Sequence, residues 1–345
     1  MSNTALLQWL VQKSAPTLAN RAVDTSPRIF HFGSRNIAVS GPTEKTAAFN
    51  FSGLWPMSGH SAEVDVVLLS DDDMASIAPL GAFRRGPYGS FVTPDEKDGV
   101  LPASGLGDWL ICIEHDKSRL LAFDCNTKIA LLWFARNPPP RELAEFCRPL
   151  LHWLAIGDGN VIIHAAAIAH DGRAVLVAGD GNAGKTTLVR ACLAAGLDYL
   201  GDNVVEVSLA QGTGNDAHVW GAYPSLKVRQ GSPDFEGLTL PAPLWDDEAR
   251  KEIYFLGKST TLAFQPRPVL HVATLVLHET AAPRLAVATA ASTFFSMAPN
   301  TVAQFPFYSA EVLERVRRVS QQAATYSAGR LDLGAIADHV RSLLA

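Results

Sequence analysis

The chain has 345 residues, of which 48% are hydrophobic and 18% charged, and this composition excludes a disordered chain and predicts a large buried core. The 29 basic and 34 acidic residues give a net charge of -5, which provides no basic field for a nucleic-acid backbone and argues against nucleic acid as the main partner. No apolar stretch could span a membrane without a charge, glycine or proline, and no signal-peptide pattern is found. We therefore expect a soluble, cytoplasmic protein with no membrane partner, and the length predicts two domains.

The first 140 residues predict a β-rich domain. A helix is expected over residues 1–27, and alternating apolar residues predict strands over 28–40, 46–54 and 64–70. A stretch rich in glycine, proline and polar residues, 81–107, predicts a long loop. Three strands then follow in quick succession, at 109–115, 120–124 and 128–134, which is typical of an antiparallel meander. No catalytic constellation is found here, so this domain is interpreted as a recognition module.

The proline run near residue 140 predicts the domain boundary, with a second domain over 141–345. Apolar residues at helical spacing predict a helix over 141–156, which Pro149 should kink or split. Strands are expected over 161–169 and 174–178, joined by a turn at 170–172. Four cysteines lie too far apart for a zinc site or a redox motif and are interpreted as buried structural residues: Cys112, Cys125, Cys147 and Cys192.

The most informative segment matches G-x-x-x-x-G-K-[ST], the Walker A pattern of a phosphate-binding loop. It lies between an apolar strand and a helix, as such a loop requires. Glycines let the backbone approach phosphate, the helix N-terminus favours an anion, the lysine adds a positive charge and the threonine hydroxyl is a magnesium ligand. The residues predicted to bind ATP are Gly179, Asp180, Gly181, Asn182, Ala183, Gly184, Lys185, Thr186 and Thr187.

Three residues near this loop are candidates for the chemistry. Asp202 follows the loop helix, which should end at Gly196, and is a candidate metal ligand or proton acceptor; a plain turn aspartate is the alternative. Glu206 is an even number of residues further on, so it should share the face of Asp202 unless it lies at a solvated edge. His164 lies on the preceding strand, and an antiparallel hairpin would bring it near the loop; a buried core histidine is the alternative.

The segment 162–207 resembles the core of the HPr kinase/phosphorylase family and its kinase-like relatives, which share a nucleotide core with phosphoenolpyruvate carboxykinases. The resemblance covers about residues 150–340. It implies an α+β or α/β fold with a mixed sheet and flanking helices, a loop that binds ATP and Mg²⁺, His164 near the transferred phosphate, and Asp202 as the first of two acids. Asn203 occupies the place of the second acid. An amide cannot accept a proton at neutral pH, so this difference argues against phosphorylase activity.

Later segments also resemble the kinase-like relatives. Lys227, in the stretch 222–228, is a candidate anion contact, with a solvated lysine as the alternative. Arg250 and Lys251 are candidates to reach phosphate from a loop, again against a solvated alternative. His271 and His278 do not have metal-ligand spacing and are interpreted as structural. Helices over 309–318 and 333–344 should cover the sheet.

The sequence thus predicts an ATP- and Mg²⁺-dependent kinase that transfers the γ-phosphoryl group to a hydroxyl of a peptide, a protein or a small molecule. Catalytic roles fall to His164, Lys185 and Asp202, and metal binding to Thr186 and Asp202. The alternative is a nucleotide-binding regulatory or scaffold module without phosphotransfer, which Asn203 favours. The identity of the acceptor and the presence of a homo-oligomer are left open.

Overall fold

The computed structural model describes residues 27–49, 54–70, 84–85, 91–92, 109–114, 119–134, 138–209, 217–258, 272–277, 285–304, 310–329 and 335–344. The chain forms two compact units, the first comprising Met1–His31, Arg35–Phe51 and Pro56–Pro139, and the second comprising Phe32–Ser34, Ser52–Trp55 and Pro140–Ala345. The helix predicted over 1–27, most of the predicted loop at 81–107, and His271 and His278 lie outside the described residues. The described parts combine helices with several mixed sheets, as expected.

The first unit is built around a seven-stranded sheet with the strand order β3-β1-β2-β4-β9-β8-β7. The meander is confirmed, because β7, β8 and β9 pair antiparallel, whereas β2–β4 and β4–β9 pair in parallel. The elements are β1 Arg28–Phe32, β2 Arg35–Ser40, α2 Thr43–Phe49, β3 Trp55–Met57, β4 Val64–Leu68, β5 Arg84–Arg85, β6 Phe91–Val92, β7 Trp109–Glu114, β8 Arg119–Asp124 and β9 Ile129–Phe134.

The strand predicted over 46–54 is wrong, because its first residues belong to helix α2. The backbone N–H of Thr46 donates to the Pro42 carbonyl (2.9 Å), which closes the first turn, and the segment contains alanine, glutamate and lysine, all good helix formers. Lys45 is buried and its Nζ donates to the Phe134 carbonyl (2.5 Å). The apolar stem of this buried lysine can lie among apolar neighbours while its ammonium group binds a backbone carbonyl.

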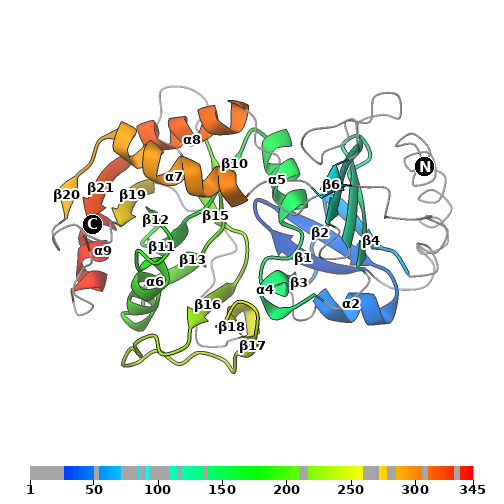
Figure 1. The fold of residues 1–345 in the computed structure, drawn as a ribbon, viewed down its shortest axis with the longest axis horizontal. Helices are drawn as coiled ribbons and strands as arrows, with labels where there is room; N and C mark the ends of the chain where they lie inside the picture. Colours follow the sequence, from blue (N-terminus) through cyan, green and yellow to red (C-terminus); the bar gives the residue numbers. More distant parts are fainter. Residues whose placement is uncertain are drawn as a thin grey trace. The chain divides into compact units, whose positions relative to one another are not determined.

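The second unit has a central six-stranded mixed sheet with the order β13-β11-β12-β19-β21-β20, and two smaller sheets, β10-β14-β15 and β16-β18-β17 (Figure 1). Its elements are α4 Pro140–Leu143, α5 Arg148–Gly157, β10 Val161–Ile163, β11 Ala166–His170, β12 Arg173–Gly179, α6 Lys185–Ala194, β13 Asp198–Gly201, β14 Val205–Ser208, β15 His218–Gly221, β16 Ser225–Arg229, β17 Leu244–Asp246, β18 Lys251–Phe255, the 3₁₀ helix Leu256–Lys258, β19 Val272–Leu277, β20 Ala286–Val287, α7 Ala290–Gln304, α8 Ala310–Gln322, β21 Ala324–Ala328 and α9 Ile336–Leu344.

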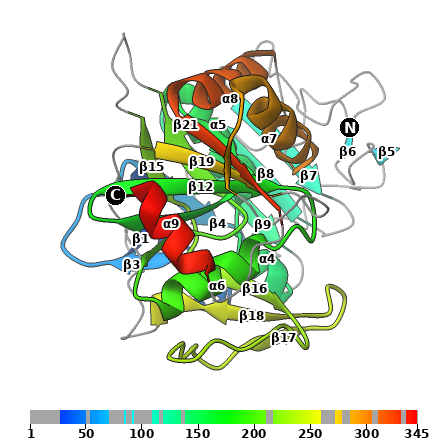
Figure 2. The ribbon, with the colours of Figure 1, turned by 90° about the vertical axis from the view of Figure 1, so that its left-hand side faces the viewer.

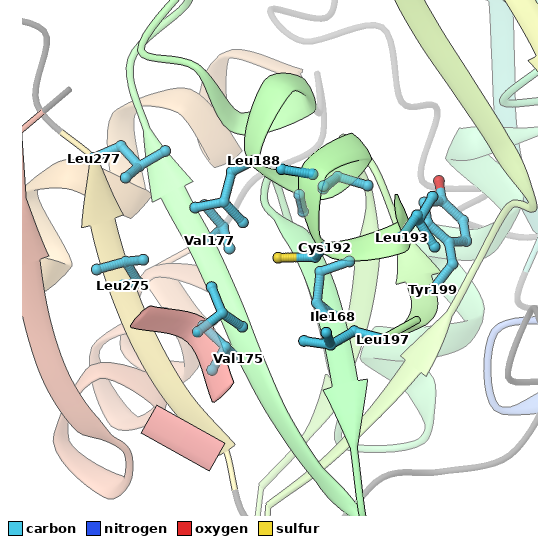
Figure 3. Close-up of a cluster of buried hydrophobic side chains, with 14 of the residues drawn as sticks. Ile168, Val175, Val177, Leu188, Cys192, Leu193, Leu197, Tyr199, Leu275 and Leu277 are labelled. Carbon is cyan, nitrogen blue, oxygen red and sulfur yellow. The ribbon is translucent and has the colours of Figure 1, made fainter. Parts of the chain in front are cut away.

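Helices cover both faces of this central sheet: α6 and α9 lie on one face, and α7 and α8 on the other (Figure 2). Alternation along β12 explains the two cores, because Val175 and Val177 face α6 while Leu176 faces the α7–α8 side. Figure 3 shows Val175 and Val177 together with Leu188 of α6 in the first core. An apolar strand buried on both faces is what the sequence predicted for 174–178.

The helix predicted over 141–156 is split into α4 and α5, as Pro149 indicated. Pro149 occupies the first turn of α5, where its missing N–H costs nothing, and Cys147 immediately before α5 has a left-handed backbone (φ 58°). Residues 144–147 form the turn between the two helices. Cys147 is buried, as are Cys112 and Cys192, whereas Cys125 is half-buried; all four are free thiols.

The strand predicted over 161–169 is interrupted at His164. Residues before it form β10, which pairs with β14, and residues after it form β11, which pairs with β12 and β13. The segment therefore passes from one sheet to another, and His164 lies at the crossing point. None of the helices in the described part of the chain is long and apolar enough to cross a membrane.

Candidate functional site

The phosphate-binding loop follows β12, which lies between antiparallel β11 and parallel β19. Gly179 ends this strand with φ 146°, and a Cβ there would lie 2.6 Å from the Leu277 carbonyl oxygen of β19. Only glycine fits such a close approach with that backbone. Gly184 (φ 105°) immediately precedes α6, so its left-handed backbone also favours glycine.

Lys185 and Thr186 begin helix α6. The Lys185 side chain is almost fully buried, and its Nζ donates to the carbonyl oxygens of Gly179 (2.7 Å) and Asp180 (3.0 Å). Burial lowers the pKa of Lys185 below its ordinary value. The ammonium group is thus held over the loop by two backbone acceptors, which a phosphate could replace with a stronger, charge-assisted partner.

Strand register brings His164 and Asp202 to the end of the sheet where the loop lies. Ala166, near the start of β11, pairs with Val177, near the end of β12. On the other side of β11, Ala167 pairs with Gly201, the last residue of β13. His164 lies two residues before the start of β11 and Asp202 directly follows β13, so both are at the same edge as the loop. The hairpin predicted from the sequence is therefore confirmed.

Asp202 is buried and contacts Thr186, whose Oγ1 donates to the carboxylate at 3.0 Å from Oδ2 and 3.2 Å from Oδ1. Burial raises the pKa of Asp202 to about 6, although the Thr186 hydrogen bond and nearby lysines partly oppose this. A hydroxyl and a carboxylate in contact are the hard oxygen donors that Mg²⁺ prefers, and the remaining ligands of such an ion are commonly phosphate oxygens and water. This donor pair therefore fits Mg²⁺.

His164 is buried, and its backbone N–H donates to Thr301 Oγ1 of α7 (3.1 Å). Burial, reinforced by the positive charge of Lys185, lowers the pKa of His164 to about 4. Among the described residues, nothing hydrogen-bonds its Nδ1. The ring is therefore neutral at pH 7, and its Nδ1 is buried without a hydrogen-bond partner in the described part of the chain.

A buried ion cluster lies beside these residues and centres on Glu145, which was not predicted from the sequence. Its carboxylate accepts from Lys227 Nζ (2.5 Å), Arg148 Nη1 (3.1 Å) and Asn203 Nδ2 (2.5 Å). Burial opposes ionisation of Glu145, but Lys227 and Arg148 outweigh it and lower its pKa to about 2. The one signal available in the sequence is a carboxylate among apolar neighbours, in the segment 141–156 that was expected to be helical and kinked or split at Pro149.

Asn203 occupies the position where the resemblance placed a second acid. It has a left-handed backbone (φ 99°), which asparagine tolerates better than most residues, and its amide is committed to Glu145. Asn203 therefore has a structural reason to be an amide: it donates a hydrogen bond to a carboxylate, which aspartate could not do when ionised.

These residues border a cavity of about 480 Å³. The residues that line it are His164, Gly181, Asn182, Gly184, Lys185, Thr186, Thr187, Arg190, Asp202, Asn203, Lys227, Arg229, Ser232 and Lys251. Of the other predicted loop residues, Gly179 and Asp180 bind the Lys185 ammonium and Ala183 is buried under the loop. Arg190, Arg229 and Ser232 were not anticipated. A charged residue in the otherwise apolar run of α6 is the signal that could have identified Arg190.

Two predicted residues do not belong to this cavity. Glu206 is fully buried and accepts hydrogen bonds from Ser34 N (2.9 Å), Ser34 Oγ (2.8 Å) and Asn160 Nδ2 (2.6 Å). Both the shared face with Asp202 and the solvated-edge alternative are wrong, because residues 202–204 form a turn between β13 and β14 and break the alternation. Arg250 is exposed in the turn before β18, with φ 51°, and only its neighbour Lys251 lines the cavity.

No family model matches the sequence, and no curated protein matches it. Among solved structures, the chain is similar to the HPr(Ser) kinase/phosphatase from Coxiella burnetii, with 11% sequence identity and a TM-score of 0.27, over 53% of this chain and 93% of that one. A similarity of this size says nothing about activity, so the function has to be inferred from the residues of the cavity themselves.

Proposed function

We propose that the chain is an ATP- and Mg²⁺-dependent kinase that transfers the γ-phosphoryl group to a hydroxyl of a peptide, a protein or a small molecule. The observation that carries this proposal is the contact between Thr186 and Asp202 in one cavity with Lys185 and His164. A phosphate-binding loop alone would support nucleotide binding. A buried carboxylate against its threonine adds a group for metal binding and for proton transfer.

Each residue has a role that follows from its position. The backbone N–H groups at the start of α6 and the Lys185 ammonium bind the phosphates. Thr186 and Asp202 would hold Mg²⁺, which neutralises charge on the phosphate oxygens. Asp202 is the one carboxylate among the described residues that line the cavity, so it would be the group that accepts the proton of the acceptor hydroxyl. In the metal-free protein, burial raises its pKa to about 6.

In the proposed transfer, one bond to the γ-phosphorus forms and one breaks. The acceptor oxygen forms a bond to the γ-phosphorus, the bond between that phosphorus and the bridging oxygen breaks, and ADP leaves with the electron pair. The acceptor's hydroxyl proton passes to an oxygen of Asp202. His164, neutral at this pH, lines the cavity and would contact a phosphate or acceptor oxygen without adding charge.

The second candidate is a nucleotide-binding module that does not transfer phosphate. Asn203 favours it, because the position next to Asp202 holds an amide committed to Glu145 rather than a second base. The two proposals share the phosphate-binding loop and differ only in whether Asp202 acts on an acceptor.

Calorimetric titration of the full chain with Mg²⁺-ATP tests the shared part. Lys185→Met should weaken binding at least 10-fold, whereas Lys128→Met, which removes an exposed lysine of the first unit, should leave it within twofold. Transfer of labelled γ-phosphate to a panel of hydroxyl-bearing peptides and metabolites then separates the candidates. Tight Mg²⁺-ATP binding without any labelled product would favour the binding module, and equal binding by Lys185→Met would contradict both.

A further inference from the structure

Arg190 of α6 is a buried arginine whose positive charge has few hydrogen-bond or acidic partners among the described residues. Arg190 is 5% exposed, and neither its Nε nor its Nη1 has a hydrogen-bond partner among the described residues. Within that part of the chain its ion pairing is limited to a contact from Nη2 to Asp234 at 3.5 Å, and the Asp234 side chain is fully exposed, so water screens this pair. A guanidinium never loses its charge in proteins, and a buried charge without partners is costly.

The position of Arg190 separates it from the phosphate-binding loop. It comes five residues after Lys185 on α6, which corresponds to about 7.5 Å along the helix axis. Its guanidinium lies over the Phe235 ring, with 5.3 Å from Cζ to the ring centroid. This cation–π contact fixes the plane of the group without using its N–H donors. Arg190 nevertheless lines the same cavity as the loop.

Two more cations on that cavity lack an acidic partner among the residues that the structure describes. Arg229 and Lys251 are directly opposite each other in the β16–β18 ladder, and in the described part of the chain no carboxylate lies within 4.0 Å of either. Like charges at paired positions destabilise a sheet. Lys227, in contrast, is neutralised by Glu145. Of the described cavity residues, three cations therefore remain after the loop and the Glu145 cluster are accounted for: Arg190, Arg229 and Lys251.

We propose that this cavity contains a second anion site, centred on Arg190 and supported by Arg229, Lys251 and the Ser232 hydroxyl, which binds a phosphate or carboxylate group of the phosphoryl acceptor. The inference rests on the proposed kinase function. The nucleotide phosphates have their own partners in the loop, Lys185 and Thr186. Arg190 lines the same cavity and carries two buried guanidinium nitrogens, Nε and Nη1, that lack a hydrogen-bond partner among the described residues and so call for another anion. An arginine fork suits both oxyanions, because two N–H groups can donate to two oxygens.

The test measures binding of inorganic phosphate and of acetate to the full chain, by calorimetry at constant ionic strength, with the loop occupied by saturating Mg²⁺ and a non-hydrolysable ATP analogue. We expect at least one of the two anions to bind under these conditions. Arg190→Gln should weaken that binding at least 10-fold and leave Mg²⁺-ATP affinity within twofold. The matched control is Arg317→Gln on α8, which removes an exposed, surface-paired arginine and should change neither affinity.

Substitution of a buried residue such as Arg190 can unfold a protein for structural reasons, so the double variant Arg229→Gln, Lys251→Gln provides an independent test at the rim. It should also weaken anion binding at least fivefold at unchanged nucleotide affinity. The proposal is overturned if neither anion binds beside the nucleotide analogue, or if Arg190→Gln weakens Mg²⁺-ATP binding 10-fold, which would assign Arg190 to the nucleotide. Failure of the kinase proposal is seen separately, as an absence of labelled product from the unmodified chain when the hydroxyl-bearing panel is tested with Mg²⁺-ATP.

Discussion

Replacing Glu145 by glutamine should destabilise the second unit strongly, because this carboxylate is the common partner of two buried or half-buried cations. Its side chain is 3% exposed and contacts Lys227 at 2.5 Å and Arg148 at 3.1 Å. Removing one member of a buried ion pair leaves uncompensated charge and typically costs about 3–5 kcal/mol. The pKa shift gives a similar figure: a fall from 4.5 to about 2 corresponds to about 3 kcal/mol in favour of the folded, ionised state.

The sign of the pH dependence follows from the direction of that shift. A depressed carboxyl pKa contributes stability that is fully present above the unfolded value of 4.5 and is lost as the pH falls toward the folded value of about 2. At pH 3 about 2 kcal/mol of the difference between the original chain and Glu145→Gln should have disappeared.

Urea unfolding at pH 7 and pH 3 measures this difference. The control is Glu311→Gln on α8, whose side chain is 59% exposed and whose partner Arg315 also donates to the carbonyl oxygens of Ile156 and Asn160. Its cost should stay below about 1 kcal/mol. A loss of less than about 1 kcal/mol in Glu145→Gln at pH 7, or a loss that does not shrink at pH 3, would refute the assignment of Glu145 as the charge centre of the cluster.

Two further predictions concern the loop and its carboxylate. Asp202→Asn should abolish phosphoryl transfer. Without Mg²⁺ or nucleotide it should stabilise the protein by up to about 3 kcal/mol above pH 7, because burial raises the folded pKa of Asp202 to about 6 from 3.8, and the gain should disappear below pH 4. A variant that is both active and unstabilised would contradict the role. Gly179→Ala should lower the free energy of unfolding by more than about 2 kcal/mol, measured by thermal or urea unfolding, because its Cβ would meet the Leu277 carbonyl. The control Gly172→Ala, at φ 76° with open space around it, should lower it by about 1 kcal/mol. Equal losses of stability would show that the close approach is not the reason for glycine at 179.

The sequence alone was sufficient for features that depend on local pattern. The strand 174–178, the loop glycines, the helix that ends before Gly196 and the split at Pro149 each follow from the chemistry of neighbouring residues. The hairpin that brings His164 toward the loop was also predictable, because a short turn between two apolar strands leaves few alternatives. Local pattern and short connections are therefore enough to bring Lys185, Thr186, Asp202 and His164 together.

The predictions that were wrong concern features that depend on tertiary packing. Alternation over 46–54 could not show that its first residues belong to a helix. Nor could it show that Glu206 faces Ser34 and Asn160 instead of Asp202, because a single turn changes which face a side chain occupies.

Only the tertiary structure determines the electrostatics of the cavity. Glu145 is 58 residues from Asn203, and its effect on that amide and on Lys227 depends on segments that the chain brings together from a distance. The same holds for Arg190, which resembles an ordinary helix residue until its burial and its shortage of acidic partners among the described residues are known. The sequence alone predicted a phosphate-binding loop and the strand–loop–helix unit that contains it, because that motif depends on local backbone chemistry. The fold decided which charges around it are neutralised and which remain free, because burial and pairing are properties of three-dimensional packing.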